Sequence, residues 1–134
     1  MPNKPISADK VFKRLIKLAV QLRSPTGCPW DRKQTIFSLA PKIEEEGDEL
    51  LEAVKKKDYP NLCEEMGDLL FNLLMVAQIA EEEKRFTLVD ILQGIEKKIK
   101  SRHSWVFGKD KAKTPEEAIE LWKKNKEKER KFKM

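Results

Sequence analysis

Cysteine, histidine and glycine are all scarce in this sequence of 134 residues. The two cysteines are Cys28 and Cys63, and the single histidine is His103. A structural zinc site needs about four cysteine or histidine ligands, so this composition disfavours one. The N-terminus has no apolar signal-peptide core, and we therefore expect a cytoplasmic protein with free thiols. No run approaches the roughly 18–20 consecutive apolar residues of a transmembrane helix, so no membrane partner is expected.

The remaining composition favours an all-α fold. The sequence has only five glycines, while 38% of its residues are charged and 40% are hydrophobic. Lysine and glutamate are the most frequent charged residues. Such a composition is typical of helical proteins. The length suits one compact domain, so we expect residues 1–134 to form a single domain, with its core over about 7–128 and a frayed basic C-terminal end.

Hydrophobic periodicity and turn residues predict four or five helices and no strand. The expected helices run from Ser7 to about Gln21–Arg23, from a start within 32–41 to about Lys57, over about 61–84, from Thr87 or Asp90 to near His103, and from Thr114 onward. The first of them carries the apolar stripe Val11, Leu15, Leu18 and Leu22. Residues 24–31, with two prolines and a glycine, and residues 104–113 are expected to be loops. The expected architecture is an all-α bundle.

The net charge of +5 hides a segregation of charge along the chain. Residues 38–72 contain four basic and ten acidic side chains, whereas residues 97–134 contain fourteen basic and six acidic ones. An acidic middle and a basic C-terminal third are compatible with a site that binds a metal ion and phosphate. Solvated helix faces are the more common cause of such charge runs.

Two acidic pairs lie at helical spacing inside the acidic region. At about 100° per residue, Glu65 shares a narrow strip of its helix with Asp68 and Asn72, and apolar side chains flank this strip on both sides. We expect the strip to be buried, which is costly unless its polar groups are paired or bound to metal. On the preceding helix, Glu46 and Glu49 lie at the edge of the apolar stripe.

The two pairs are expected to face each other. A short turn at residues 58–60 joins their helices, which must therefore pack antiparallel. Four facing carboxylates can form a hard oxygen cage for Mg²⁺ or Mn²⁺, and without metal they would repel each other or take up protons. Taken singly, each pair could also be an exposed acidic turn. A di-iron site is nearly excluded, because it requires Glu-x-x-His motifs and no glutamate precedes His103 by three residues.

Three segments together resemble the MazG-type nucleoside triphosphate pyrophosphohydrolases. They are CPWDRKQTIFSLAPKIEEEGDELLEAV, EEMGDLLFNLL and KKIKSRHSWVFG, and the similarity runs from about Leu15 to Lys128. The resemblance implies an all-α fold that associates as a dimer or a dimer of dimers. It also implies Mg²⁺-dependent hydrolysis of NTPs or dNTPs between the α and β phosphates, giving the monophosphate and pyrophosphate, with a role in clearing unwanted nucleotides.

The same resemblance assigns roles to individual residues. Four carboxylates would hold Mg²⁺, or Mn²⁺ in its place: Glu46, Glu49, Glu65 and Asp68. Glu45 would sit beside them and orient the attacking water. Lys98 and Arg102 match a K-x-x-x-R motif that meets phosphate oxygens, and Trp122 and Lys126 match a W-x-x-x-K motif that contacts the nucleotide. Asn72 and Trp30 complete the set of substrate-binding candidates.

Several alternatives stay open at the level of sequence. Trp122, Trp30 and Trp105 could equally pack in a core or a dimer interface, and Lys98 with Arg102 could form a solvated basic face. His103 is expected to anchor a loop rather than act as a general base. The related dUTPase, dCTP or phosphoribosyl-ATP pyrophosphatase reactions are the main rivals. The non-enzymatic alternatives are a basic module that binds nucleic acid and a helical scaffold with no activity. Because a nucleotide hydrolase is the preferred interpretation, nucleic acid is not the expected partner.

Overall fold

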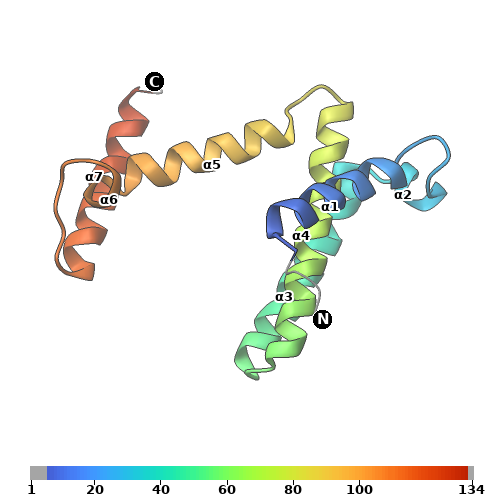
Figure 1. The fold of residues 1–134 in the computed structure, drawn as a ribbon, viewed down its shortest axis with the longest axis horizontal. Coiled ribbons are helices and arrows are strands. Elements are labelled where there is room, and N and C mark those ends of the chain that lie inside the picture. The colour runs from blue at the N-terminus through green and yellow to red at the C-terminus, as the bar shows by residue number, and fades with distance from the viewer. Residues whose placement is uncertain (1–5, 133–134) are drawn as a thin grey trace. The chain divides into compact units, whose positions relative to one another are not determined.

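The computed structural model describes residues 6–132, and these residues form seven helices and no strand (Figure 1). The helices are α1 (Ala8–Leu22), α2 (Pro29–Lys33), α3 (Ile36–Lys55), α4 (Tyr59–Glu82), α5 (Leu88–Arg102), α6 (Ser104–Phe107) and α7 (Pro115–Phe132). The five long helices are those predicted from the sequence, so the all-α class is confirmed. Helix α7 runs to Phe132, past residue 128, from which fraying is expected.

Two short helices correct the predicted loops. Helix α2 begins at Pro29, inside the segment 24–31, and α6 occupies Ser104–Phe107, inside the segment 104–113. Proline is compatible with the first helical position, because its fixed φ suits the helix and its missing N–H has no intrahelical partner there. The prolines and glycine of 24–31 therefore mark a helix start as well as a turn.

The structure separates into two compact units, one ending at Leu88 and one beginning at Val89. The first contains α1 to α4, and the second contains nearly all of α5 together with α6 and α7. Among the described residues, none of the helices combines the length and the apolar character that crossing a lipid bilayer requires. Cys28 and Cys63 are both free thiols, as expected.

Helices α3 and α4 form the antiparallel hairpin expected from the short turn between them (Figure 1). Lys57 ends α3 in the left-handed region at φ 55°, and Asp58 N donates to Ala53 O at 3.0 Å. Asp58 Oδ1 then accepts a hydrogen bond from Asn61 N at 3.3 Å and so caps α4. The turn is therefore fixed by hydrogen bonds at both helix ends, which also sets the register of the two helices.

The first unit has an apolar core shared by three helices. Ala19 from α1, Leu39 from α3, and Met75 and Ile79 from α4 are buried against one another. On α1 the stripe read from the sequence is not buried as a whole, because Val11 and Leu18 are exposed. A small residue, Ala19, makes the buried contact instead, since alanine allows helices to approach closely.

Gly27 allows the chain to turn back after α1. Gly27 N donates to Ser24 O, and Cys28 N donates to Leu22 O, both at 2.8 Å. A Cβ at Gly27 would overlap the carbonyl oxygens of Gln21 and Leu22, so only glycine fits this position. The tight return places α2 directly after α1.

Candidate active site

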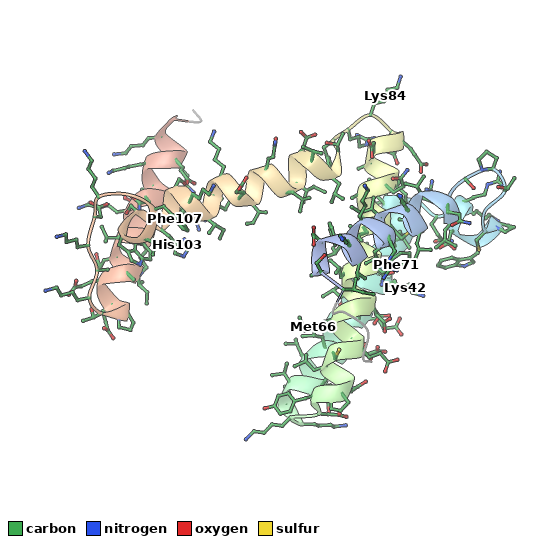
Figure 2. The ribbon with its side chains drawn as sticks, in the orientation of Figure 1. Lys42, Met66, Phe71, Lys84, His103 and Phe107 are labelled. Atoms are coloured by element: carbon green, nitrogen blue, oxygen red, sulfur yellow. The ribbon has the colours of Figure 1, made fainter. Side chains whose placement is uncertain are left out.

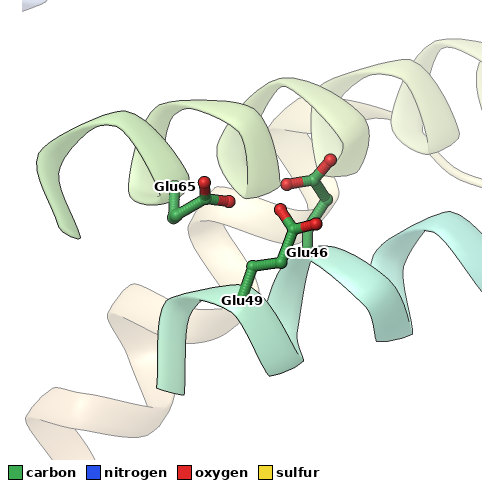
Figure 3. A group of neighbouring side chains, drawn as sticks. All are labelled: Glu46, Glu49 and Glu65. Atoms are coloured by element: carbon green, nitrogen blue, oxygen red, sulfur yellow. The ribbon is translucent and has the colours of Figure 1, made fainter. Parts of the chain in front are cut away.

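Three glutamate side chains meet between α3 and α4 (Figure 3). Glu46 and Glu49 come from α3 and Glu65 from α4, and one carboxylate oxygen of each lies within 4.8 Å of the others. The spacing of three residues puts Glu46 and Glu49 on one face of α3, and the antiparallel hairpin brings Glu65 opposite them. The structure thus joins three of the four carboxylates expected at a metal site.

Glu65 is the carboxyl group of this cluster that most readily takes up a proton. The neighbouring Glu49 side chain, burial, and the Glu46 side chain together raise the pKa of Glu65 to about 7. Glu65 has only 8% of its surface exposed. When protonated, it can donate a hydrogen bond to a glutamate of α3, which relieves part of the repulsion among the three groups.

Glu46 is affected by the same neighbours. Burial raises the pKa of Glu46 above its ordinary value, and the charges of Asp68, Glu49 and Glu45 raise it further, while the contact with Glu65 lowers it. Among the described residues, the buried oxygens Glu46 Oε2 and Glu65 Oε2 have no hydrogen-bond partner. Such oxygens are costly to bury unless a proton or a cation meets them.

Asp68 and Glu45 lie beside the three-glutamate cluster without joining it. Both are exposed, and both act on Glu46 through their charge. The expectation of a fully buried strip on α4 is therefore wrong at Asp68, while Glu65 and Asn72 are buried as expected. Asp68 instead lines a pocket that adjoins the cluster.

A pocket of about 290 Å³ adjoins the cluster. Its polar wall is formed by Trp30 and Asp31 of α2, Lys42 and Glu46 of α3, and Asp68 and Asn72 of α4. Its apolar part comes from Leu39, Phe71 and Met75; Figure 2 labels Lys42 and Phe71. A concave site that combines apolar surface with a few polar groups is typical of small-molecule binding.

Two residues of this pocket have distinctive surroundings. Asn72 is only 8% exposed, and no described residue makes a hydrogen bond with its side-chain amide. Trp30 is 53% exposed, and Lys42 Nζ lies 5.3 Å from the centroid of its ring. The amide and the indole ring are therefore both available to a ligand in the pocket.

Sequence reasoning identified neither Asp31 nor Lys42 as a pocket residue. Asp31 directly follows Trp30 on α2, and Lys42 precedes Glu46 by four residues. That spacing places Lys42 and Glu46 on one face of α3. The signal for Lys42 was therefore present in the sequence, whereas Asp31 depended on a helix that was expected to be a loop.

The second unit holds a separate group of cations. Arg102 Nη2 lies 3.2 Å from Glu129 Oε2, and the Arg102 guanidinium lies 5.1 Å from the centroid of the Trp122 ring. Lys126 Nζ is also 5.1 Å from that centroid. Three of the four expected substrate contacts of this unit are thus brought together. Lys98, the fourth, is exposed on α5, and among the described residues it has no ion pair.

His103 and Trp105 link α5 to α6. His103 Nδ1 donates to Ile99 O at 2.7 Å, and the His103 and Trp105 rings have centroids 5.0 Å apart. Asn125 of α7 donates to Arg102 O at 3.1 Å and to Ser104 Oγ at 2.8 Å. These contacts support the interpretation of His103 as a loop anchor.

Comparison with known protein families gives a consistent result. The MazG nucleotide pyrophosphohydrolase domain family matches residues 34–107, more than half of the chain. A nucleoside triphosphate pyrophosphohydrolase of Escherichia coli (strain K12) is 41% identical over 118 residues, which are 87% of this chain and 45% of that protein. The MazG nucleoside triphosphate pyrophosphohydrolase/pyrophosphatase of Thermotoga maritima is 44% identical over 101 residues, which are 75% of this chain and 40% of that protein.

A solved structure is also similar. The crystal structure of a MazG-related protein from Thermotoga maritima matches with a TM-score of 0.73 and 36% sequence identity, over 86% of this chain and 98% of that one. The chain spans less than half the length of the two curated relatives named above. The acidic hairpin α3–α4 lies within the matched residues. The resemblance seen in the sequence is thereby confirmed: this chain belongs to the MazG nucleotide pyrophosphohydrolase domain family.

Proposed function

We propose that this protein is a Mg²⁺-dependent nucleoside triphosphate pyrophosphohydrolase that cleaves NTPs or dNTPs between the α and β phosphates. The observation that carries the proposal is the three-glutamate cluster, whose buried oxygens lack hydrogen-bond partners among the described residues and which adjoins a pocket of ligand size. The names of the two similar proteins from Escherichia coli and Thermotoga maritima support the reaction class.

The cluster suits a hard divalent cation. Carboxylate oxygens are the ligands that Mg²⁺ and Mn²⁺ prefer, and a cation would relieve both the mutual repulsion and the unpaired buried oxygens. Glu46, Glu49 and Glu65 would hold it, with Asp68 contributing from the pocket side. When bound, Mg²⁺ supplies Lewis-acid polarisation of phosphate oxygens and activation of water.

The residues of the first unit then position the substrate. Trp30 offers an aromatic face to the nucleoside, and the unpaired Asn72 amide offers it N–H donors and a carbonyl acceptor. Glu45, one residue before Glu46 and exposed, would accept a hydrogen bond from the attacking water and so orient it. Phosphoryl transfer depends mainly on such positioning and on charge stabilisation.

The cations of the second unit are proposed to bind the triphosphate. Arg102 can offer two parallel N–H donors to phosphate. In this structure its Nε donates to Glu129 Oε2 at 3.2 Å, and its Nη2 lies 3.2 Å from the same oxygen. Lys98 and Lys126 would add positive charge, and Trp122 would contact the nucleotide. Binding would then require phosphate oxygens to replace Glu129 as the partner of Arg102.

Assembly and location also remain proposals. We propose a homodimer or a dimer of dimers, and a cytoplasmic protein. Exposed apolar side chains on α1 and α4, among them Leu18, Leu70 and Leu73, support association with another surface.

Product analysis tests the proposed function. The purified protein is incubated with a panel of NTPs and dNTPs, with Mg²⁺, Mn²⁺ or EDTA, and the products are separated by ion-exchange chromatography. Monophosphate with pyrophosphate, abolished by EDTA, is the expected result, and the panel ranks the bases, including dUTP and dCTP. Diphosphate with orthophosphate, or no turnover with either Mg²⁺ or Mn²⁺, would refute the proposal.

A further inference from the structure

Helix α2 carries Trp30 and Asp31 to the pocket, yet it has no apolar anchor of its own. It contains five residues and none of them is buried. A single helical turn of this length is not stable in isolation, because nucleation is costly and few hydrogen bonds repay it. Contacts from elsewhere in the first unit must therefore hold α2 in place.

Arg23 supplies two such contacts. Its Nη1 donates to Asp31 O at 2.5 Å and to Gln34 O at 3.1 Å. Gln34 is the C-terminal cap of α2, so both carbonyls belong to the end at which a helix has few backbone partners for its carbonyl groups. Asp31 O also accepts a hydrogen bond from Gln34 N at 3.3 Å. A cation at this end also matches the negative pole of the helix dipole.

The other edge of the same guanidinium is fixed to α4. Arg23 Nε donates to Glu82 Oε2 at 2.9 Å and Nη2 donates to Glu82 Oε1 at 2.8 Å, which is a bidentate pair. Gln78 Nε2 donates to Glu82 Oε2 at 3.4 Å. The Arg23 side chain is only 9% exposed, and its hydrogen bonds, together with its charge, hold the pKa of Glu82 below the ordinary value. The pair is thus ionised at neutral pH and shielded from water on the Arg23 side.

Glu82 is the last residue of α4, the helix that also carries Glu65, Asp68 and Asn72. The Arg23 side chain therefore connects α4, which carries these acidic residues, to α2, which forms part of the pocket wall. Gln34 extends the link, because its Nε2 donates to Trp30 O at 2.9 Å. No lysine could replace this arrangement, since four directed donor contacts from one planar group require a guanidinium.

We propose that Arg23 is a positioning residue, which fixes α2 so that Trp30 and Asp31 form the wall of the pocket beside the three-glutamate cluster, and which thereby sets the affinity for the nucleotide. The effect on affinity rests on the proposed function. Arg23 is not part of the three-glutamate cluster and does not itself line the pocket. It contacts the backbone carbonyls of Asp31 and Gln34, so it acts through α2.

The test compares Arg23→Lys, Glu82→Gln and the matched control Arg32→Lys in the full-length protein. Arg32 is an exposed arginine of α2 whose side chain makes no hydrogen bond or ion pair with the described residues. Hydrogen exchange of the free protein is followed by mass spectrometry, and KM and kcat are measured for the nucleotide that the product analysis ranks first.

Arg23→Lys is expected to speed exchange of the amides in residues 28–35 by about tenfold or more, because charged hydrogen bonds of this kind are lost. Exchange within α4 should stay unchanged. KM should rise by about tenfold or more while kcat changes by less than about threefold, because misplaced contacts weaken binding before they reach the reacting atoms. Glu82→Gln keeps the two carbonyl contacts of Arg23, so its effects should be smaller, and Arg32→Lys should behave as wild type.

Three results would overturn the proposal. They are unchanged exchange in residues 28–35, faster exchange throughout α4, and local loosening of α2 with an unchanged KM. A wild-type protein that turns over no nucleotide would refute the proposed function only. The hydrogen-exchange measurement would still decide whether Arg23 holds α2 in place.

Discussion

The two units of this protein differ in the residues that are buried inside each of them. In the first, Ala19, Leu39, Met75 and Ile79 form a buried apolar core. In the second, over the residues 89–131 whose burial is described, Asn125 is the one buried residue, and it is polar. Helix α5 has no buried residue although Ile91, Ile95 and other apolar side chains lie on it.

The two units also differ in how their charged side chains are paired. In the first unit, core packing between α3 and α4 forces three glutamates together, so their repulsion is built into the fold. In the second, the cations are engaged by an ion pair and by an aromatic ring, which are exchangeable contacts. The glutamate cluster of the first unit thus concentrates negative charge that a bound cation would neutralise. The cations of the second unit can exchange their present partners for others.

The largest expected effect comes from removing one charge of the cluster. Glu49→Gln should lower kcat by at least about 10²-fold while the fold survives, because charge stabilisation at the reacting phosphate is lost. Asp48→Asn is the matched control, since Asp48 is exposed on the same helix and lies outside the cluster. Steady-state kinetics with circular dichroism checks both variants, and a wild-type rate for Glu49→Gln would remove the basis of the proposed metal site.

A smaller loss is expected from the cations of the second unit. Arg102→Ala should lower kcat/KM by about tenfold or more, because a bidentate phosphate contact disappears. Lys128→Ala, an exposed lysine on α7, should change it by less than about twofold. The two variants are compared in one assay at fixed ionic strength. Equal small effects would mean that Arg102 does not meet phosphate.

The pH dependence of stability should arise from the glutamate cluster of the first unit and not from the second unit. The pKa of Glu65 lies at about 7 in the folded protein against an ordinary value of 4.5, so the folded state binds this proton more tightly than the unfolded state. Without metal, the stabilisation is complete below about pH 4.5 and is lost as the pH rises to about 7 and beyond.

Thermal unfolding in EDTA across that range measures the effect. The Tm should fall as the pH rises, and Glu65→Gln should flatten the fall and raise the Tm near pH 7.5. Glu120→Gln, an exposed change on α7 in the second unit, should leave the slope as in wild type. A Tm that rises with pH between about 4.5 and 7 would contradict the description of the cluster.

The smallest effect concerns the helix ends of the first unit. Lys57 and Lys84 follow α3 and α4 with φ of 55° and 57°, a region that costs a residue with a Cβ more than it costs glycine. Lys57→Gly should therefore stabilise the protein by on the order of 0.5 kcal/mol. Lys55→Gly, inside the last turn of α3, should destabilise it by about 1 kcal/mol. Denaturant unfolding measures both, and a loss of stability in Lys57→Gly would contradict the predicted sign.

The sequence was sufficient to predict elements whose signals are local. The antiparallel α3–α4 hairpin follows from Pro60 and the short turn before it, and the approach of Glu65 to Glu46 and Glu49 follows from that hairpin. What could not be predicted depends on contacts between distant residues. Helix α2 is fixed by Arg23 and Glu82, which are 59 residues apart, and the burial of Ala19 in place of Leu18 depends on how α1 meets α4.

The most direct test of this account is Mn²⁺ binding followed by electron paramagnetic resonance, with Mg²⁺ as competitor. It is applied to the wild-type protein, to Glu49→Gln and to Arg102→Ala. We expect the wild type and Arg102→Ala to bind Mn²⁺ alike and to release it to Mg²⁺, and Glu49→Gln to lose most of this binding. Unchanged Mn²⁺ binding by Glu49→Gln, or its loss in Arg102→Ala, would contradict the assignment of the metal to the acidic hairpin of the first unit.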